Sequence, residues 1–115
     1  MKNKIKVINI EKGMPTVDVA EKRLMFEIAT ARREGITALK VVHGYGSSGV
    51  GGKIKDMVKK VLSARKREGA LKAFVAGEEW DIFNSSTRQL MDLCNELRAD
   101  RDLQNQNHGI TIVLL

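Results

Sequence analysis

Residues 39–53 read Leu39-Lys40-Val41-Val42-His43-Gly44-Tyr45-Gly46-Ser47-Ser48-Gly49-Val50-Gly51-Gly52-Lys53. An apolar run typical of a strand opens this stretch, and a lysine-rich helical pattern follows it. Half of the chain's ten glycines lie between positions 44 and 52. Glycines let backbone N–H groups approach a ligand, and the dipole of the following helix favours an anion. The stretch therefore predicts a strand, a loop that binds phosphate and a helix.

Strand and helix patterns alternate on both sides of this unit. Strands are expected at about 4–10, 37–43, 71–76 and 109–114. Helices are expected from Thr16, a predicted N-cap, to Gly35, over about 51–68, and after a capping box at Ser86–Gln89. The first helix has a core stripe at Val17, Ala20, Leu24, Ile28 and Ala31. The second has an apolar arc at Ile54, Val58, Val61 and Leu62, with Met57 beside it. The order βαβαβ(α)β indicates an α/β fold, with residues 1–115 forming a single domain.

The third helix belongs to a segment inserted at about 77–108. Leu90, Leu93, Cys94 and Leu97 form its apolar face, with Trp80 and Phe83 as a small satellite core. On the first helix, Val19 and Phe26 lie opposite the core stripe. We expect the inserted helix to cover this outer face, or the two surfaces to meet across a dimer, so that the protein is a monomer or a homodimer.

Composition places the chain among ordinary globular proteins, with 43% hydrophobic and 30% charged residues. No apolar run approaches the ~20 residues that span a bilayer, and residues 1–5 lack the apolar core of a secretion signal. The single Cys94 allows no internal disulfide, and no Cys/His cluster has zinc spacing. We expect a cytoplasmic protein with no membrane association, no cofactor and no metal site. A divalent cation is expected only if the chain is a nuclease.

The net charge of +6 is concentrated on the second helix. Residues 53–67 contain seven bases and one acid, and the rest of the chain contains 13 bases and 13 acids. Lys53, Lys60 and Arg67 border one side of the apolar arc, and Lys55, Lys59 and Lys66 border the other. Because cations near a helix N-terminus oppose the dipole, a ligand anion would relieve the mismatch at Lys53 and Lys55. The helix therefore predicts a surface that binds a polyanion, DNA or RNA.

Two nucleotide-binding patterns resemble the glycine loop. Gly44-x-Gly46-x-x-Gly49 fits the dinucleotide fingerprint, but the chain before it offers only one further βα unit instead of a full Rossmann half. A Walker A loop would require glycine at Ser47 and serine or threonine at Ile54. Binding of a phosphorylated small molecule in the loop is the alternative that stays open.

The ordered motifs of this chain resemble those of the Smr (small MutS-related) domain family. His43-Gly44-Tyr45-Gly46 is similar to the family's HGxG motif, and Gly109-Ile110-Thr111-Ile112-Val113-x-Leu115 to its final strand. The stretch 13–20 is similar to its entry into the first helix. The resemblance implies a two-layer α/β sandwich, similar to the C-terminal domain of translation initiation factor three. It also implies DNA or RNA binding, often with endonuclease activity.

Two departures from the family pattern affect the expected activity. Where the family has an L-D-x-H motif at the end of the first strand, this chain has Ile8-Asn9-Ile10-Glu11. Asparagine cannot exchange protons, so Asn9 can only position a partner. We therefore expect cleavage to be slow or absent. The second departure is the helix within 77–108, where the family usually has a turn or hairpin, and it indicates a surface specific to this lineage.

These patterns assign a role to each candidate residue. An endonuclease would use His43 as general acid or base, with Glu11 orienting it or binding a cation. Otherwise His43 contacts phosphate or caps the strand end, and Glu11 is a solvated surface residue. Tyr45 stacks on an unpaired base or packs against the second helix. Nucleic acid is expected to contact His43, Gly44, Tyr45, Gly46, Ser47, Ser48, Gly49, Lys53, Lys55, Lys60 and Arg67.

Overall fold

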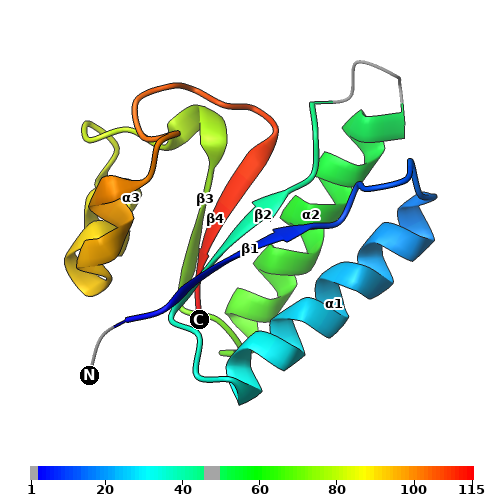
Figure 1. Cartoon of the computed structure of the whole chain (residues 1–115), viewed down its shortest axis with the longest axis horizontal. Helices are drawn as coiled ribbons and strands as arrows, with labels where there is room; N and C mark the ends of the chain where they lie inside the picture. The colour runs from blue at the N-terminus through cyan, green and yellow to red at the C-terminus, as the bar shows by residue number, and fades with distance from the viewer. Residues whose placement is uncertain (1–2, 46–49) are drawn as a thin grey trace.

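The computed structural model describes residues 3–45 and 50–115, in which a four-stranded sheet is flanked by helices (Figure 1). The strands are β1 (Ile5–Asn9), β2 (Ala38–Val42), β3 (Ala73–Ala76) and β4 (Ile110–Leu114), and the helices are α1 (Val17–Arg33), α2 (Val50–Arg67) and α3 (Ser85–Leu93). Two short 3-10 turns, η1 (Gly77–Glu79) and η2 (Asn95–Ala99), flank α3. The strand order is β1-β2-β4-β3, with β1 parallel to β2 and β4 antiparallel to both of its neighbours. The predicted α/β fold and element order are confirmed.

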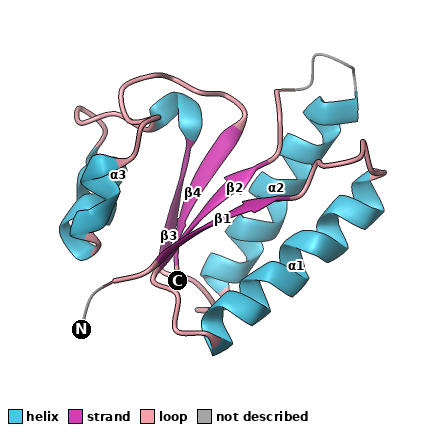
Figure 2. Ribbon diagram, viewed as in Figure 1, coloured by secondary structure: helices cyan, strands magenta, loops and turns pink. Residues whose placement is uncertain are grey.

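Helices α1 and α2 pack side by side on one face of the sheet (Figure 2). Thr16 is the N-cap of α1, as predicted, because its side chain accepts a hydrogen bond from the backbone N–H of Val19. The predicted stripe of α1 and arc of α2 meet Leu39, Val41 and Val113 of the sheet in one apolar cluster. Alternation along each strand sends these side chains to the helices and their neighbours to the other face.

The opposite face of the sheet is covered in part by α3 and η2. Trp80, Leu90, Met91, Cys94 and Leu97 pack there against side chains of β3 and β4, in a second apolar cluster. The prediction that the inserted helix covers α1 is therefore wrong: Val19 and Phe26 remain exposed on the far side of the molecule. The apolar side chains of this sheet face, such as Ile112 and Leu114, provide the surface on which α3 packs. The two-layer arrangement of the sheet with α1 and α2 thus carries a partial third layer.

Details of segment 77–108 also differ from expectation. Helix α3 begins after Asn84, whose side-chain oxygen accepts a hydrogen bond from the N–H of Thr87, so Asn84 and not Ser86 is the N-cap. The helix ends at Leu93, which is exposed, and Leu97 reaches the core from η2. Of the predicted satellite pair, Trp80 is fully buried and Phe83 is 82% exposed.

Candidate functional site

The ends of β1 and β2 bring the predicted catalytic residues to one edge of the sheet. Asn9 is the register partner of Val42, and the N–H of Ile10 donates to the carbonyl of Val42 at 3.1 Å. The side chain of Asn9 accepts a hydrogen bond from the N–H of Glu11 at 3.0 Å and shapes the turn that leaves β1. Parallel pairing therefore places Glu11 beside the residues that follow β2, because parallel strands end at the same edge.

His43 is completely buried, and both of its ring nitrogens have partners. Nδ1 lies 2.9 Å from the carbonyl oxygen of Gly44, which can only accept, so Nδ1 carries the proton. Nε2 then accepts a hydrogen bond from the hydroxyl of Thr111 on β4, also at 2.9 Å. Burial lowers the pKa of His43 below its ordinary value of 6.5, so the ring is neutral at pH 7. This geometry ties the start of the glycine loop to β4.

Glu11 lies directly over Gly44 and not against the imidazole of His43. Gly44 has φ +81°, and a Cβ atom added there would fall 2.1 Å from a carboxylate oxygen of Glu11. The partners of the His43 ring are Gly44 and Thr111, so in the described part of the chain Glu11 does not orient His43 by a hydrogen bond. The positive φ favours glycine at position 44, whereas the flexible end of the Glu11 side chain could move away from a larger residue.

Tyr45 lies against the start of β4. Its ring carbons come within 3.2 Å of the position that a Cβ atom would take on Gly109, and 65% of the residue is exposed. The absence of a side chain on Gly109 gives the ring room to lie there. Four of the residues that we expect to contact nucleic acid fall outside the described residues: Gly46, Ser47, Ser48 and Gly49.

Six of the seven basic residues of α2 form two rows. In row A (Lys53, Lys60 and Arg67), Lys53 and Lys60 border a shallow groove together with Val17 and Glu21. In row B (Lys55, Lys59 and Lys66), Lys55 and Lys59 line a groove beside β3. Lys55 pairs with Glu78 at 2.8 Å. Five basic side chains of α2 have no ion pair with any described residue: Lys53, Lys59, Lys60, Lys66 and Arg67.

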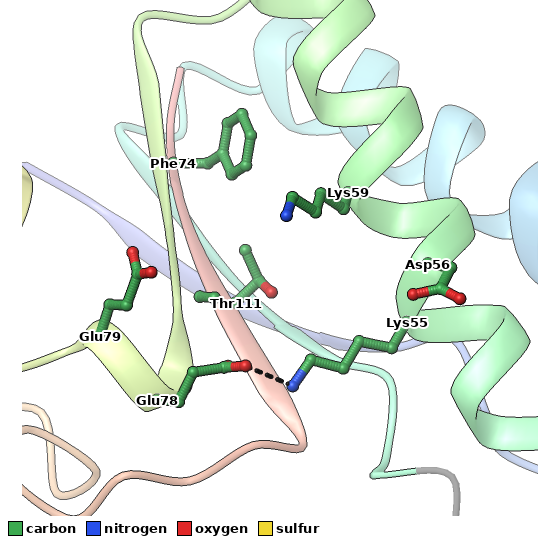
Figure 3. Close-up of a pocket in the computed structure, with 8 residues that line it drawn as sticks. Lys55, Asp56, Lys59, Phe74, Glu78, Glu79 and Thr111 are labelled. Atoms are coloured by element: carbon green, nitrogen blue, oxygen red, sulfur yellow. Dashed lines mark hydrogen bonds and ion pairs between the residues drawn. The ribbon is translucent and has the colours of Figure 1, made fainter.

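A groove of about 280 Å³ separates row B from the edge strand β3 (Figure 3). It is lined by Lys55, Asp56, Lys59, Phe74, Ala76, Glu78, Glu79 and Thr111. The Lys55–Glu78 pair bridges it at one end, and Lys59 extends into it from α2. Burial alone would raise the pKa of Glu78, but the hydrogen bonds that its carboxylate accepts from Lys55 and from its own backbone, together with the charge of Lys55, lower that pKa below its ordinary value. The groove thus holds two lysines and three carboxylates, and of the two lysines Lys55 is paired with Glu78 while Lys59 has no ion pair with a described residue.

The structure joins the predicted residues to others that sequence reasoning missed. It brings His43 next to Thr111, and through Thr111 to the groove with Phe74 and Lys59. The sequence patterns assign none of these last three residues a contact to nucleic acid, although they place Lys59 in row B. The alternation of β3 alone indicates that Phe74 shares a face with Ala76, but the partner of that face depends on the strand order.

The described residues show neither of two other kinds of site. Among residues 3–45 and 50–115, no cluster of three or more His, Cys, Asp or Glu side chains could hold a metal ion. No described helix combines the length and apolar character that crossing a bilayer requires.

Comparisons with known proteins agree with one another. The sequence model of the Smr domain matches residues 12–81 of this chain. A solved structure, the Smr domain of Thermus thermophilus MutS2, is similar to it with a TM-score of 0.59 and 21% sequence identity, and the match covers 96% of each chain. At that identity the likeness shows the fold. No curated protein matches the chain.

Proposed function

Because the chain belongs to the Smr domain family, we propose that it is a nucleic-acid-binding domain that holds phosphates with its glycine loop and the basic face of α2. The loop at 43–49 and the helix N-terminus would hold one phosphate, and Lys53, Lys55, Lys60 and Arg67 would contact others along the strand. Family membership supports the class of ligand, and the placement of charge supports the surface.

One observation carries this proposal: five bases of α2 have no acidic partner among the described residues. Lysines on a structural helix are commonly paired with acids three or four residues away. On α2 the first turn contains no acid, and Asp56 lies between the two rows. Like charges crowded on one face weaken the folded state, and a polyanion removes that repulsion.

In this role His43 positions the loop. Its neutral ring contacts the Gly44 carbonyl on one side and Thr111 on the other, which fixes the start of the loop relative to β4. The N–H groups of a helix N-terminus then face the phosphate. This arrangement gives the histidine a function in binding that does not require proton transfer.

Equilibrium binding to labelled oligonucleotides tests the proposal. Single-stranded, duplex and branched forms of DNA and RNA are titrated with the protein at several salt concentrations. We expect binding whose logarithm falls linearly with the logarithm of salt concentration, because each neutralised phosphate releases counterions. A protein that binds none of these ligands at low salt would contradict the proposal.

A mononucleotide competitor separates this function from the binding of a phosphorylated small molecule. A small ligand needs the glycine loop, whereas a polymer uses the full length of α2. We expect ATP or inorganic phosphate to displace an oligonucleotide poorly. ATP and an unlabelled oligonucleotide are compared as competitors at the same phosphate concentration. If ATP displaces the labelled oligonucleotide equally well, the small-molecule alternative is favoured.

A further inference from the structure

The lining residues and the size of the groove between row B and β3 do not suit a duplex. On the α1 and α2 face of the sheet, the helices bury Leu39, Val41 and Val113. They do not extend across β3, whose Phe74 and Ala76 line the groove. At about 280 Å³ the groove falls just below the ~300 Å³ at which sites for small organic ligands begin. It has room for one planar group and is too small for a double helix.

Phe74 supplies an apolar wall of the groove opposite Lys59. The residue is half-buried, and one part of it packs against the main apolar cluster while the groove exposes the rest. The ring and the Lys59 side chain lie on opposite walls, from β3 and α2 (Figure 3). An aromatic ring beside cations is the combination by which proteins hold single strands, because a base stacks on the ring while the cation binds its phosphate.

The charged side chains at the two ends of the groove determine how a nucleotide would be oriented in it. Lys59 has no partner among the described residues and is available for a phosphate. At the other end the groove is lined by Glu78, which is ionised, and by Glu79. Their carboxylates repel phosphate, and a carboxylate oxygen accepts a hydrogen bond from an N–H donor of a base edge. Thr111 donates its hydroxyl hydrogen to His43, so it too faces the groove as an acceptor.

We propose that this groove holds one unpaired nucleotide of a single strand, with its base against Phe74 and its phosphate at Lys59. This inference rests on the proposed function and makes it specific, because it selects single-stranded segments over duplex. It adds Phe74 and Lys59 to the binding residues.

Fluorescence anisotropy with two labelled strands of equal length tests the inference. One is an ordinary single-stranded oligonucleotide, and the other is an abasic strand that keeps every phosphate. We expect the wild-type protein to bind the ordinary strand more tightly. Phe74→Leu should weaken that binding by up to roughly 5- to 150-fold, the range for one base stacked on an aromatic side chain. It should leave binding to the abasic strand unchanged.

Three further variants control this experiment. Phe74→Tyr keeps a ring and should restore binding to the ordinary strand, which a role of Phe74 in folding alone would not explain. Lys59→Gln should weaken binding to both strands alike and reduce the salt slope by about 0.7. Lys22→Gln, an exposed lysine of α1, should change neither.

The possible failures are distinguishable. If the wild-type protein binds neither strand, the proposed function is wrong and the inference falls with it. If it binds both strands equally and Phe74→Leu binds them as the wild type does, the function stands and the groove is not a nucleotide site. A preference for duplex that survives Phe74→Leu would also overturn the inference.

Discussion

The Nε2 atom of His43 lies 2.9 Å from the hydroxyl oxygen of Thr111, a residue 68 positions further along the chain. The contact joins the end of β2 to β4 and is buried. Because Thr111 also lines the groove, one hydrogen bond connects the glycine loop with the proposed nucleotide site. Loss of this bond would affect both the stability of the fold and the position of the loop.

Protonation of His43 should destabilise the protein in mildly acidic solution. Burial lowers the pKa of His43 in the folded state, so below pH 6.5 the unfolded chain binds more protons than the folded one. Stability is therefore complete above about pH 6.5 and decreases as the pH falls below it. Chemical denaturation between pH 5 and pH 8 should show a slope of up to about 1.4 kcal/mol per pH unit from this group.

Replacement of His43 by an apolar residue tests this assignment. His43→Leu should be less stable at pH 8 by about 1–3 kcal/mol, because the Thr111 hydroxyl and the Gly44 carbonyl lose their partner. Its stability should vary less between pH 5 and pH 7 than that of the wild type. Equal pH dependence in the wild type and His43→Leu would contradict the assignment.

Local patterns were sufficient to predict the elements on the α1 and α2 face. The cap at Thr16, the stripe of α1 and the arc of α2 depend on residues within one or two helical turns, and all three are confirmed. Parallel pairing of β1 and β2 follows from the βαβ order, which is why Glu11 could be placed near the end of β2. Short-range spacing contains that information.

The groove and the third layer depend on information that local patterns lack. Phe74 and Lys59 face each other only because β4 enters the sheet between β2 and β3, which places β3 at the edge beyond α2. The apolar face of α3 predicted burial but not the surface that covers it. Val19 and Phe26 on the outer side of α1 and the apolar residues of the sheet face were both possible partners, and α3 packs on the sheet face.

Row A of α2 should contribute phosphate contacts. Replacing Lys53, Lys60 and Arg67 together by glutamine removes three unpaired cations and leaves row B intact. We expect weaker binding to every nucleic acid tested, and a salt slope reduced by roughly 0.7 to 0.9 for each phosphate that the variant no longer neutralises. Salt titrations of the variant and the wild type measure this. An unchanged slope would remove row A from the interface.

Cleavage of nucleic acid should be slow or undetectable. In the L-D-x-H motif of the family, an acid and a histidine occupy the positions that are Asn9 and Glu11 in this chain. In addition, His43 is buried and both of its ring nitrogens have hydrogen-bond partners. Labelled strands incubated with the protein and Mg²⁺, then separated by gel, measure the rate. If products form, His43→Ala should reduce the rate strongly and Glu11→Gln in part. Fast cleavage that survives both changes would indicate a different catalytic centre.

A buried ion-pair network attaches the segment after η2 to the sheet. Lys40 of β2 points to the face covered by α3, where its side chain is 9% exposed and contacts the carboxylates of Asp100 and Asp102. Trp80 donates its indole N–H to Asp100 at 3.1 Å, and Asn107 donates to Asp102 at 3.1 Å. Burial would lower the pKa of Lys40, but the two carboxylates more than reverse this and raise it.

Lys40→Met should therefore cost about 3–5 kcal/mol of unfolding free energy in urea denaturation at pH 7, because it leaves two carboxylates buried without a cation. The hydrogen bond from Lys40 holds the pKa of Asp102 below its ordinary value of 3.8, so this stabilisation is present above that pH and is lost as the pH falls below it. The difference between variant and wild type should narrow in acid. Lys6→Met, which removes a lysine with two surface partners, Glu27 and Glu34, should change stability far less. Equal effects at Lys40 and Lys6 would show that the network does not stabilise the fold.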